Sequence, residues 1–382
     1  MKDKRVSEYT ILRIIGIMLV VVGHAGSVEI ASISGATGFA ASAVNELVEF
    51  SQVYIYSFHM PLFFFLSGAV FNLAKTGERP FESVFKSKFL HLMVPYFCFL
   101  ILYSLPVKML AGVYNLPTSA YIVSNMFATT ESSGHLWFLY KLFSATMLFW
   151  IYNKLLLSKR PALWFTILLA VTIIGINIPM IMFIVPTNIY VTFFAIGFMF
   201  EKIRSRVAKW AQSHKILTIA MFAVYFYLFY MKNLAVARVF EFNNVYFNRM
   251  YDSVVRIALP CVSIFAWFML ACVIASFKKL SESRIITNLD SNCMNIYVLH
   301  DMLNYVVMWL FGHFAAGAAS SADAMLFVMM IRIFGVFAVA WLMSLLLSKA
   351  MKFKLFKRTA VIAAAVLFIC SVGYVYIGNL VP

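Results

Sequence analysis

Long apolar runs alternate with short polar segments along the whole chain. Eleven runs, each close to the length of a membrane-spanning helix, occupy residues 10–29, 53–73, 88–111, 135–157, 161–178, 183–200, 215–231, 253–276, 292–312, 325–348 and 360–379. About 20 apolar residues cross a bilayer as an α-helix. The pattern therefore predicts an all-α fold, a polytopic integral membrane helical bundle.

The charges between the runs support this interpretation, because Lys and Arg gather in alternate polar segments. The basic segments are the N-terminus, 75–88, 154–160, 202–215, 278–284 and 349–358. The segments 30–52, 112–134, 179–182 and 313–324 carry almost no Lys or Arg and are expected to be outer segments. Segment 232–252 is also assigned outside, although its charges are mixed, and is interpreted either as a lid or ligand surface or as a solvated loop. The N-terminus is thus expected in the cytoplasm and the C-terminus outside.

Composition agrees with a membrane protein and leaves no room for a sizeable soluble domain. The chain has 382 residues, of which 63% are hydrophobic and 12% charged, and its mean hydropathy is +0.89. The net charge of +16 is explained by the cytoplasmic segments, so a nucleic-acid partner is not expected. The first run contains Arg13 and is too long for a typical signal peptide, so it is interpreted as a retained helix.

The cysteines do not indicate a redox or metal framework. There are five, Cys98, Cys261, Cys272, Cys293 and Cys370, scattered in or beside apolar runs without CxxC or Cys/His spacing. Neither a disulfide framework nor a bound metal is expected.

Ionisable residues inside apolar runs identify the candidate site, since each is costly in a bilayer and usually faces the bundle interior. The first run, RIIGIMLVVVGH, places Arg13 and His24 on nearly the same helix face. Alternatively, Arg13 snorkels to the interface and His24 is a packed histidine.

The second run opens SFHMPLFFFLSGAVF, which contains His59, Ser67 and Gly68. Histidine is a natural general base at neutral pH, so the pair His24 and His59 indicates a reaction centre. Ser67 is interpreted either as orienting a histidine or the acceptor, or as a packing residue.

Two later runs add further polar groups. The fourth begins GHLWFLYKLF, with His135 and Trp137 at its start, and the ninth contains NIYVLHD, with His300 and Asp301. Trp137 also fits an interfacial belt residue. Asp301 and Arg332, from the tenth run, are interpreted as a structural ion pair, because an unpaired charge there would be costly.

Taken together, these motifs resemble membrane-bound acyltransferase family 3. The likeness rests on RIIGIMLVVVGH, FHMPLFFFLSG, HLWFL and IYVLH in this order. The second motif is most similar to the branch of fucose O-acetyltransferase-like and related polysaccharide acetyltransferases.

The resemblance implies a ten-helix acyltransferase core over 1–357 and an additional C-terminal transmembrane helix over 358–382. It implies transfer of acetyl from cytoplasmic acetyl-CoA to a hydroxyl of a cell-surface glycan or its lipid-linked precursor, in the plasma (inner) membrane. By the same match, His24 is essential, Arg13 helps to position CoA, and Phe64 and Trp137 belong to the second and third motifs.

Departures from the family pattern bear on the donor site. Where members often carry arginines after the second helix, this chain has Arg79, Lys86 and Lys88, so the two lysines are candidate CoA ligands. His135, Trp137, Phe64 and His300 are candidates for substrate binding, and glycan-synthesis machinery is an expected partner.

Two mechanisms and two other functions remain open. His24 serves either as general base or as an acyl-carrying nucleophile. The alternatives are a transporter or flippase of lipid-linked sugars and an assembly subunit with an inert pocket.

Overall fold

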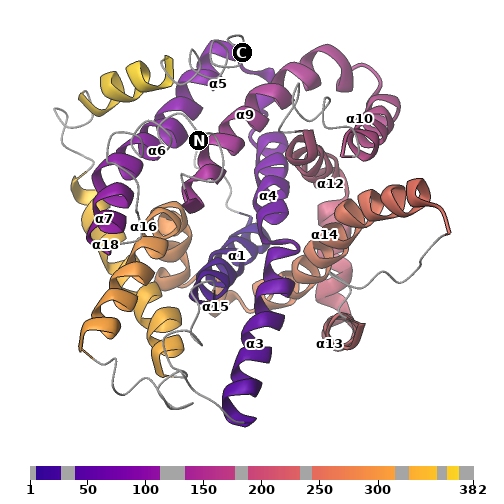
Figure 1. The fold of residues 1–382 in the computed structure, drawn as a ribbon. Coiled ribbons are helices and arrows are strands. Elements are labelled where there is room, and N and C mark those ends of the chain that lie inside the picture. The colour runs from indigo at the N-terminus through magenta and orange to yellow at the C-terminus, as the bar shows by residue number, and fades with distance from the viewer. Residues whose placement is uncertain are drawn as a thin grey trace. The chain divides into compact units, whose positions relative to one another are not determined.

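The computed structural model describes residues 6–26, 39–111, 134–176, 188–232, 243–314, 327–350 and 359–369. All regular structure in these ranges is helical, without a strand. This confirms the all-α membrane bundle expected from the apolar pattern (Figure 1).

The helices follow the apolar runs. They are α1 (Ser7–Gly26), α3 (Phe39–Tyr56), α4 (His59–Leu73), α5 (Phe81–Lys88), α6 (Val94–Phe99), α7 (Leu105–Leu110), α9 (Trp137–Tyr152), α10 (Pro161–Gly175), α12 (Asn188–Ser213), α13 (Lys215–Lys232), α14 (Val245–Ala275), α15 (Lys278–Ser281), α16 (Arg284–Phe314), α18 (Val336–Ala350) and a final helix, Thr359–Ile369. Short π-helical turns occupy Phe89–Met93, Leu100–Ser104, Asn153–Leu157 and Ile331–Gly335. Each of the eleven apolar runs overlaps at least one helix.

Within the described ranges, five helical stretches are long and apolar enough to cross a membrane. They are Ser7–Ala25, Glu46–Leu73, Phe81–Leu110, Val245–Ala275 and Phe327–Leu347. The other described helices are too short, too polar or both to be counted as spans. For example, α10 has 15 residues, fewer than the roughly 20 that a straight span needs.

Three expectations about connections were wrong. The segment 30–52, expected as a loop, contains α3, and Glu46–Leu73 forms one long helical stretch with α4. The expected loop 232–252 ends early because α14 begins at Val245, where Asn244 Oδ1 accepts from the amide of Tyr246 and caps the helix. The runs 183–200 and 215–231 are not two separate straight spans, because α12 and α13 meet in a 100° bend.

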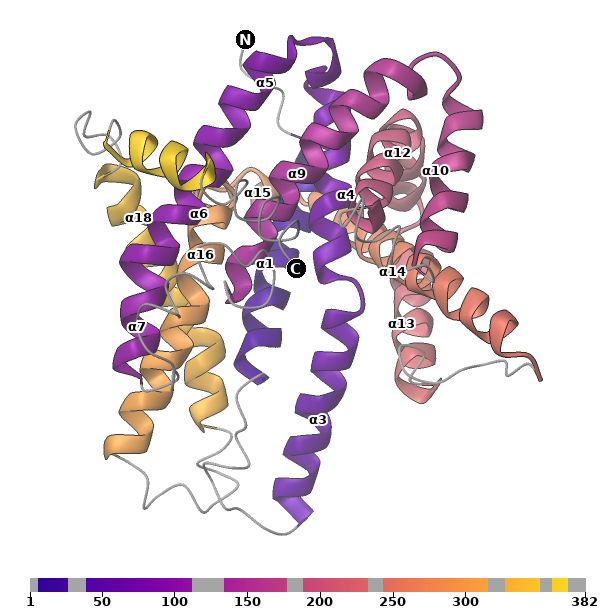
Figure 2. The same cartoon turned by 45° about the horizontal axis from the view of Figure 1, so that its top comes forward.

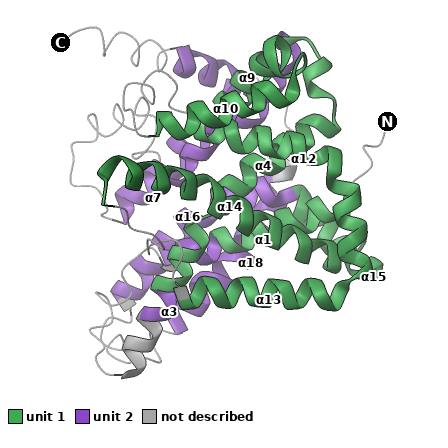
Figure 3. Ribbon diagram, turned by 90° about the vertical axis from the view of Figure 1, so that its right-hand side faces the viewer, with its two compact units in different colours: residues 1–20, 49–81, 144–291 green, residues 21–48, 82–143, 292–382 purple. Residues whose placement is uncertain are grey.

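The chain divides into two compact units, each built from several separate stretches (Figure 3). Unit 1 comprises residues 1–20, 49–81 and 144–291, and unit 2 comprises 21–48, 82–143 and 292–382.

In unit 1, α4 and α12 pack at very short range through two glycines. A Cβ added at Gly68 would overlap the carbonyl oxygen of Phe194, and one added at Gly197 would overlap that of Phe65. Small residues allow this approach, which is common between membrane helices because van der Waals contact drives their association.

A polar network also holds the first turns of α1 within unit 1. Tyr9 donates a hydrogen bond of 2.5 Å to Glu201, and Arg204 Nε lies 3.0 Å from Glu201 Oε1. Arg204 Nη1 is 3.8 Å from Glu8. These contacts join α1 to the charged part of α12.

In unit 2, α7, α16 and α18 lie side by side in both views (Figures 1 and 2). The Tyr103 hydroxyl, from the π-helical turn before α7, donates to the carbonyl of Leu299 on α16 at 3.0 Å. Such turns insert an extra residue into a helix and often occur at functional sites.

Candidate active site

One carboxylate in unit 2 accepts hydrogen bonds from two histidines. Asp301 Oδ1 lies 3.1 Å from Nδ1 of His24, and Asp301 Oδ2 lies 3.0 Å from Nδ1 of His135. His300 completes the cluster, since its ring centroid is 5.0 Å from that of His24 and 5.2 Å from that of His135. The structure thus brings together three histidines from separate sequence motifs.

Three elements supply these side chains. His24 lies in the last turn of α1, and His300 and Asp301 lie in the middle of α16. His135 belongs to the short turn Gly134–Leu136 that leads into α9. This turn depends on Gly134, whose φ of +58° is strained for a residue with a Cβ.

The hydrogen bond to Asp301 defines the tautomer of His24. A carboxylate only accepts, so Nδ1 of His24 carries the hydrogen and the lone pair of the neutral ring is on Nε2. Nε2 is the nitrogen that can take a proton from a hydroxyl. An Asp–His pair of this kind orients a general base in many hydrolases and transferases.

His135 and His300 are held by backbone carbonyls as well. His135 Nε2 lies 3.2 Å from the carbonyl oxygen of Val298, so both of its ring nitrogens face acceptors. His300 Nδ1 lies 2.6 Å from the carbonyl oxygen of Tyr297. The Tyr297 hydroxyl in turn donates to the carbonyl of His135. These bonds fix the turn before α9 against α16.

The predicted ion pair between Asp301 and Arg332 was wrong. Among the described residues, the partners of Asp301 are the two histidines. Arg332 instead donates through Nε to Asn304 Oδ1 at 3.3 Å and through Nη2 to the carbonyl oxygen of His24 at 3.0 Å. The two charges interact, but their direct hydrogen-bond partners differ.

A further cation lies close to the cluster. Lys108 is buried on α7, with Nζ 5.8 Å from the centroid of the Tyr305 ring. A Cβ built on Gly134 would be 3.0 Å from Lys108 Nζ and 3.9 Å from Asp301 Oδ2. The cluster therefore combines one carboxylate with two basic side chains, Lys108 and Arg332.

The sequence also matches a known family. Its description is "Acyltransferase domain", and the match covers residues 6–349. The chain belongs to acyltransferase family 3. Searches of curated proteins and of solved structures found no significant match. Together with its apolar helices, the family identifies the chain as a multi-pass membrane acyltransferase.

Several predicted site residues of this family 3 acyltransferase lie in unit 1 and make contacts there. The ring of His59 is buried, with Nδ1 2.9 Å from the carbonyl oxygen of Ile55 and the Tyr56 ring nearby. Ser67 donates to the carbonyl of Phe63 in its own helix. Phe64 is buried and stacks on Tyr190, with ring centroids 4.5 Å apart.

The predicted donor-binding residues are divided between the units. Arg13, in unit 1, forms an ion pair of 2.5 Å with Asp290, and about a third of its side chain is exposed. Lys86 and Lys88, in unit 2, occupy the last turn of α5. Lys86 is exposed and Lys88 half-buried. Trp137, also in unit 2, is half-buried at the start of α9.

Two functional candidates escaped the sequence analysis, Asn304 and Lys108. Asn304 follows His300 and Asp301 by four and three residues, and such spacing places all three on one face of α16. That polar stripe in an apolar run is the signal that identifies Asn304. Lys108 has a weaker signal, because it lies near the end of its run and fits an interfacial lysine.

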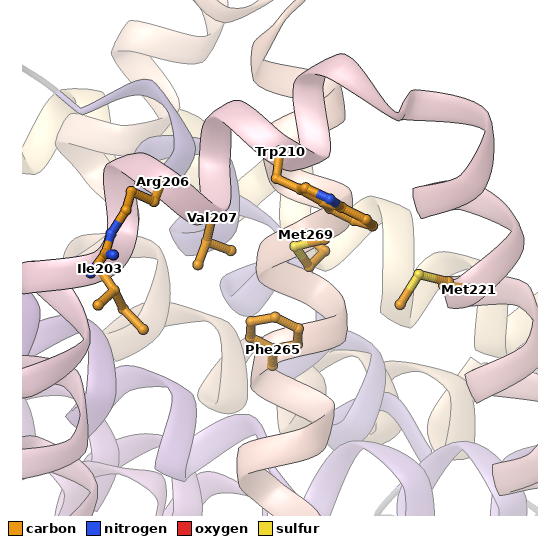
Figure 4. A pocket seen from close by; sticks show the side chains of 7 residues that line it. All are labelled: Ile203, Arg206, Val207, Trp210, Met221, Phe265 and Met269. Carbon is orange, nitrogen blue, oxygen red and sulfur yellow. The ribbon is translucent and has the colours of Figure 1, made fainter.

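A separate pocket of about 550 Å³ lies in unit 1 and lacks the groups for acyl transfer (Figure 4). Its walls are mostly apolar, and the lining residues are Ile203, Arg206, Val207, Trp210, Met221, Phe265 and Met269. None of these side chains is a general base at neutral pH. The cluster around Asp301 is therefore the candidate active site. Within the described ranges, no group of three or more His, Cys, Asp or Glu is arranged to hold a metal ion.

Proposed function

We propose that the protein is an O-acetyltransferase that moves an acetyl group from cytoplasmic acetyl-CoA to a hydroxyl of a cell-surface glycan or its lipid-linked precursor. The observation that carries the proposal is the hydrogen bond between Asp301 and Nδ1 of His24. It supplies an oriented base in a membrane acyltransferase, and a sugar hydroxyl is a poor nucleophile until a base takes its proton.

In the direct route, His24 Nε2 takes the hydroxyl proton while the hydroxyl oxygen bonds to the thioester carbonyl carbon. The carbon–sulfur bond then breaks, and the departing CoA thiolate receives the proton from His24. In the two-step route, Nε2 itself bonds to the acetyl carbon as the carbon–sulfur bond breaks and the CoA thiolate leaves. The hydroxyl oxygen then bonds to the acetyl carbon as the bond from that carbon to Nε2 breaks, and the CoA thiolate takes the hydroxyl proton. Asp301 stabilises the ring in both routes by holding the Nδ1 hydrogen.

The donor and acceptor groups are assigned by chemistry. CoA carries several phosphate charges, so Arg13, Lys86 and Lys88 are the proposed donor ligands. His135, Trp137, His300 and Phe64 are the proposed acceptor-binding residues, with His59 and Ser67 supporting the transfer. The bilayer and glycan-synthesis machinery are the proposed surroundings. No metal takes part in this scheme.

The proposed orientation has the N-terminus in the cytoplasm and the C-terminus outside, which the basic segments favour, and the proposed location is the plasma (inner) membrane. In this orientation Arg13, a proposed ligand of acetyl-CoA, lies towards the cytoplasmic side of the membrane. The alternative, a transporter of lipid-linked sugars, is less well supported because the chain belongs to an acyltransferase family.

The test is mass spectrometry of surface glycans from the native host lacking the gene, complemented by the wild type, His24→Ala or His214→Ala. His214 is exposed at the bend between α12 and α13 and serves as the matched histidine control. We expect the wild type and His214→Ala to restore an acetyl increment and His24→Ala not to. Restoration by His24→Ala would overturn the assignment of His24. Altered glycan export without altered acetylation would favour the transporter.

A further inference from the structure

We propose that Arg332 and Asn304 bind the carbonyl oxygen of the acyl thioester and stabilise the negative charge that forms on it during transfer. This inference rests on the proposed acyl-transfer function, which it extends by two catalytic residues.

The main support comes from two buried hydrogen-bond donors that have no partner among the described residues. Arg332 is 0% exposed and Asn304 is 1% exposed. Arg332 Nη1 and Asn304 Nδ2 have no hydrogen-bond partner among the described residues. A buried donor left unsatisfied costs about 1–3 kcal/mol, and more if it is charged. The two donors belong to side chains that contact each other, so the acceptor oxygen of a bound ligand would satisfy them.

The remaining bonds of the two side chains hold these donors in place. Arg332 Nε donates to Asn304 Oδ1, so the amide of Asn304 is oriented with Nδ2 away from that bond. Arg332 Nη2 donates to the carbonyl of His24. The guanidinium is therefore anchored to the backbone of the residue proposed as base. An oxyanion site must lie close to the base, because both act on the same carbonyl group, and this bond brings Arg332 to the residue proposed as the base.

The local backbone and charge fit the same role. Arg332 lies on the π-helical turn Ile331–Gly335, which departs from regular α-helix at this point of the span. In the bilayer interior an arginine is costly unless it is paired or functional. Its hydrogen bonds are to neutral groups and Asp301 interacts with it without a direct ion pair, so Nη1 is left to stabilise an anionic transition state.

The same movement of electrons at the carbonyl group occurs in the direct and the two-step route. When the hydroxyl oxygen or His24 Nε2 bonds to the carbonyl carbon, the carbonyl electron pair moves to its oxygen. Arg332 Nη1 and Asn304 Nδ2 donate to that oxyanion. The pair then returns to reform the carbonyl as the carbon–sulfur bond breaks and the CoA thiolate leaves.

Kinetics of the purified full chain give the first test. Removal of one oxyanion donor typically lowers kcat about 10²- to 10³-fold. We expect this loss for Asn304→Leu and Arg332→Gln with KM for acetyl-CoA nearly unchanged, and a smaller loss for Arg332→Lys, which keeps the charge. Arg284→Gln, which removes an exposed arginine, is the control.

A spectroscopic readout separates catalysis from a structural role. Acetyl-CoA labelled with ¹³C at the carbonyl is bound to inactive His24→Ala, which keeps the backbone carbonyl that anchors Arg332. Infrared difference spectra are expected to show the carbonyl stretch shifted to lower frequency than in free acetyl-CoA. Adding Arg332→Gln or Asn304→Leu is expected to reduce the shift while donor binding persists.

The outcomes distinguish this inference from the proposed function. If the wild type transfers acetyl but the carbonyl band of bound donor is not shifted, or the shift survives both substitutions, the inference is overturned. If acetyl-CoA neither binds nor reacts with the wild type, the proposed function itself fails. Should Arg332→Gln not fold, Asn304→Leu decides the matter alone.

Discussion

His24 and Asp301, 277 residues apart in the chain, are joined by a hydrogen bond of 3.1 Å between Nδ1 and Oδ1. The second oxygen of Asp301 holds His135 at 3.0 Å. One carboxylate thus orients two imidazoles and, through them, connects the end of α1 with the turn before α9.

Replacing Asp301 by Asn tests this relationship. An amide offers one accepting oxygen and an NH₂ group, so it cannot accept from both histidines as the carboxylate does. We expect kcat for acyl transfer to fall about 10²- to 10⁴-fold, with little change in KM for the donor. The charge-matched control is Glu282→Gln, at an exposed position. Retention of half or more of wild-type kcat by Asp301→Asn would exclude the proposed orienting role.

Gly134 offers a second test, through the turn that carries His135. Its φ is +58°, and an added Cβ would lie 3.0 Å from Lys108 Nζ. The left-handed conformation costs a residue with a Cβ about 1–2 kcal/mol. We expect Gly134→Ala to shift the turn, displace His135 and lower kcat roughly tenfold or more, because a misplacement of about 1 Å can cost about 100-fold. Kinetics together with the unfolding temperature check this.

The matched control for Gly134 is Gly312→Ala, because a Cβ there meets no atom within 4 Å. It is expected to retain kcat. Equal kcat for both alanine variants would mean that the turn geometry does not control His135.

Most of the helical fold could be predicted from hydropathy, because apolar runs of span length have few other structures in a bilayer. The helix α3 was missed because residues 39–52 include Asn45, Glu46 and Glu49, which read as a polar loop. The π-helical turns have no hydropathy signal. They depend on how neighbouring helices satisfy the backbone, and the sequence pattern does not contain that information.

The site was partly predictable. His24, His135 and His300 were recognised because ionisable groups in apolar runs are costly and usually functional. Their grouping around Asp301 was not predicted, since partners from distant helices depend on tertiary packing. The same limit explains the wrong pairing of Asp301 with Arg332, which rested on opposite charge alone.

The adjacent residues Ser67 and Gly68 are expected to differ sharply in their contribution to stability. A Cβ on Gly68 would overlap the carbonyl oxygen of Phe194, a backbone atom that cannot move without shifting α12. We expect Gly68→Ala to destabilise the protein by about 1–3 kcal/mol or more, as overpacking does. Ser67→Ala loses only a hydrogen bond to its own helix and should change stability by less than about 1 kcal/mol.

Unfolding temperatures in detergent, followed by size-exclusion chromatography of the folded fraction, compare the two variants. Gly197→Ala provides an independent check, because its Cβ would overlap the carbonyl oxygen of Phe65 in the same helix contact. Equal unfolding temperatures for Gly68→Ala and Ser67→Ala would contradict the close packing of α4 and α12.

Arg13 forms an ion pair with Asp290 and is also a proposed CoA ligand, and variants of the two residues distinguish an anchoring role from a donor-binding role. If the arginine only anchors α1, then Arg13→Gln and Asp290→Asn break the same 2.5 Å contact and have similar effects. If it also binds CoA phosphates, Arg13→Gln should raise KM for acetyl-CoA about tenfold or more, since hydrogen bonds to charged groups contribute about 1.5–3 kcal/mol. Asp290→Asn would then leave KM unchanged or lower it, because it frees the guanidinium for the donor. Steady-state kinetics of the two variants and of the double variant decide between these roles. Parallel increases in KM for both single variants would remove Arg13 from the donor site.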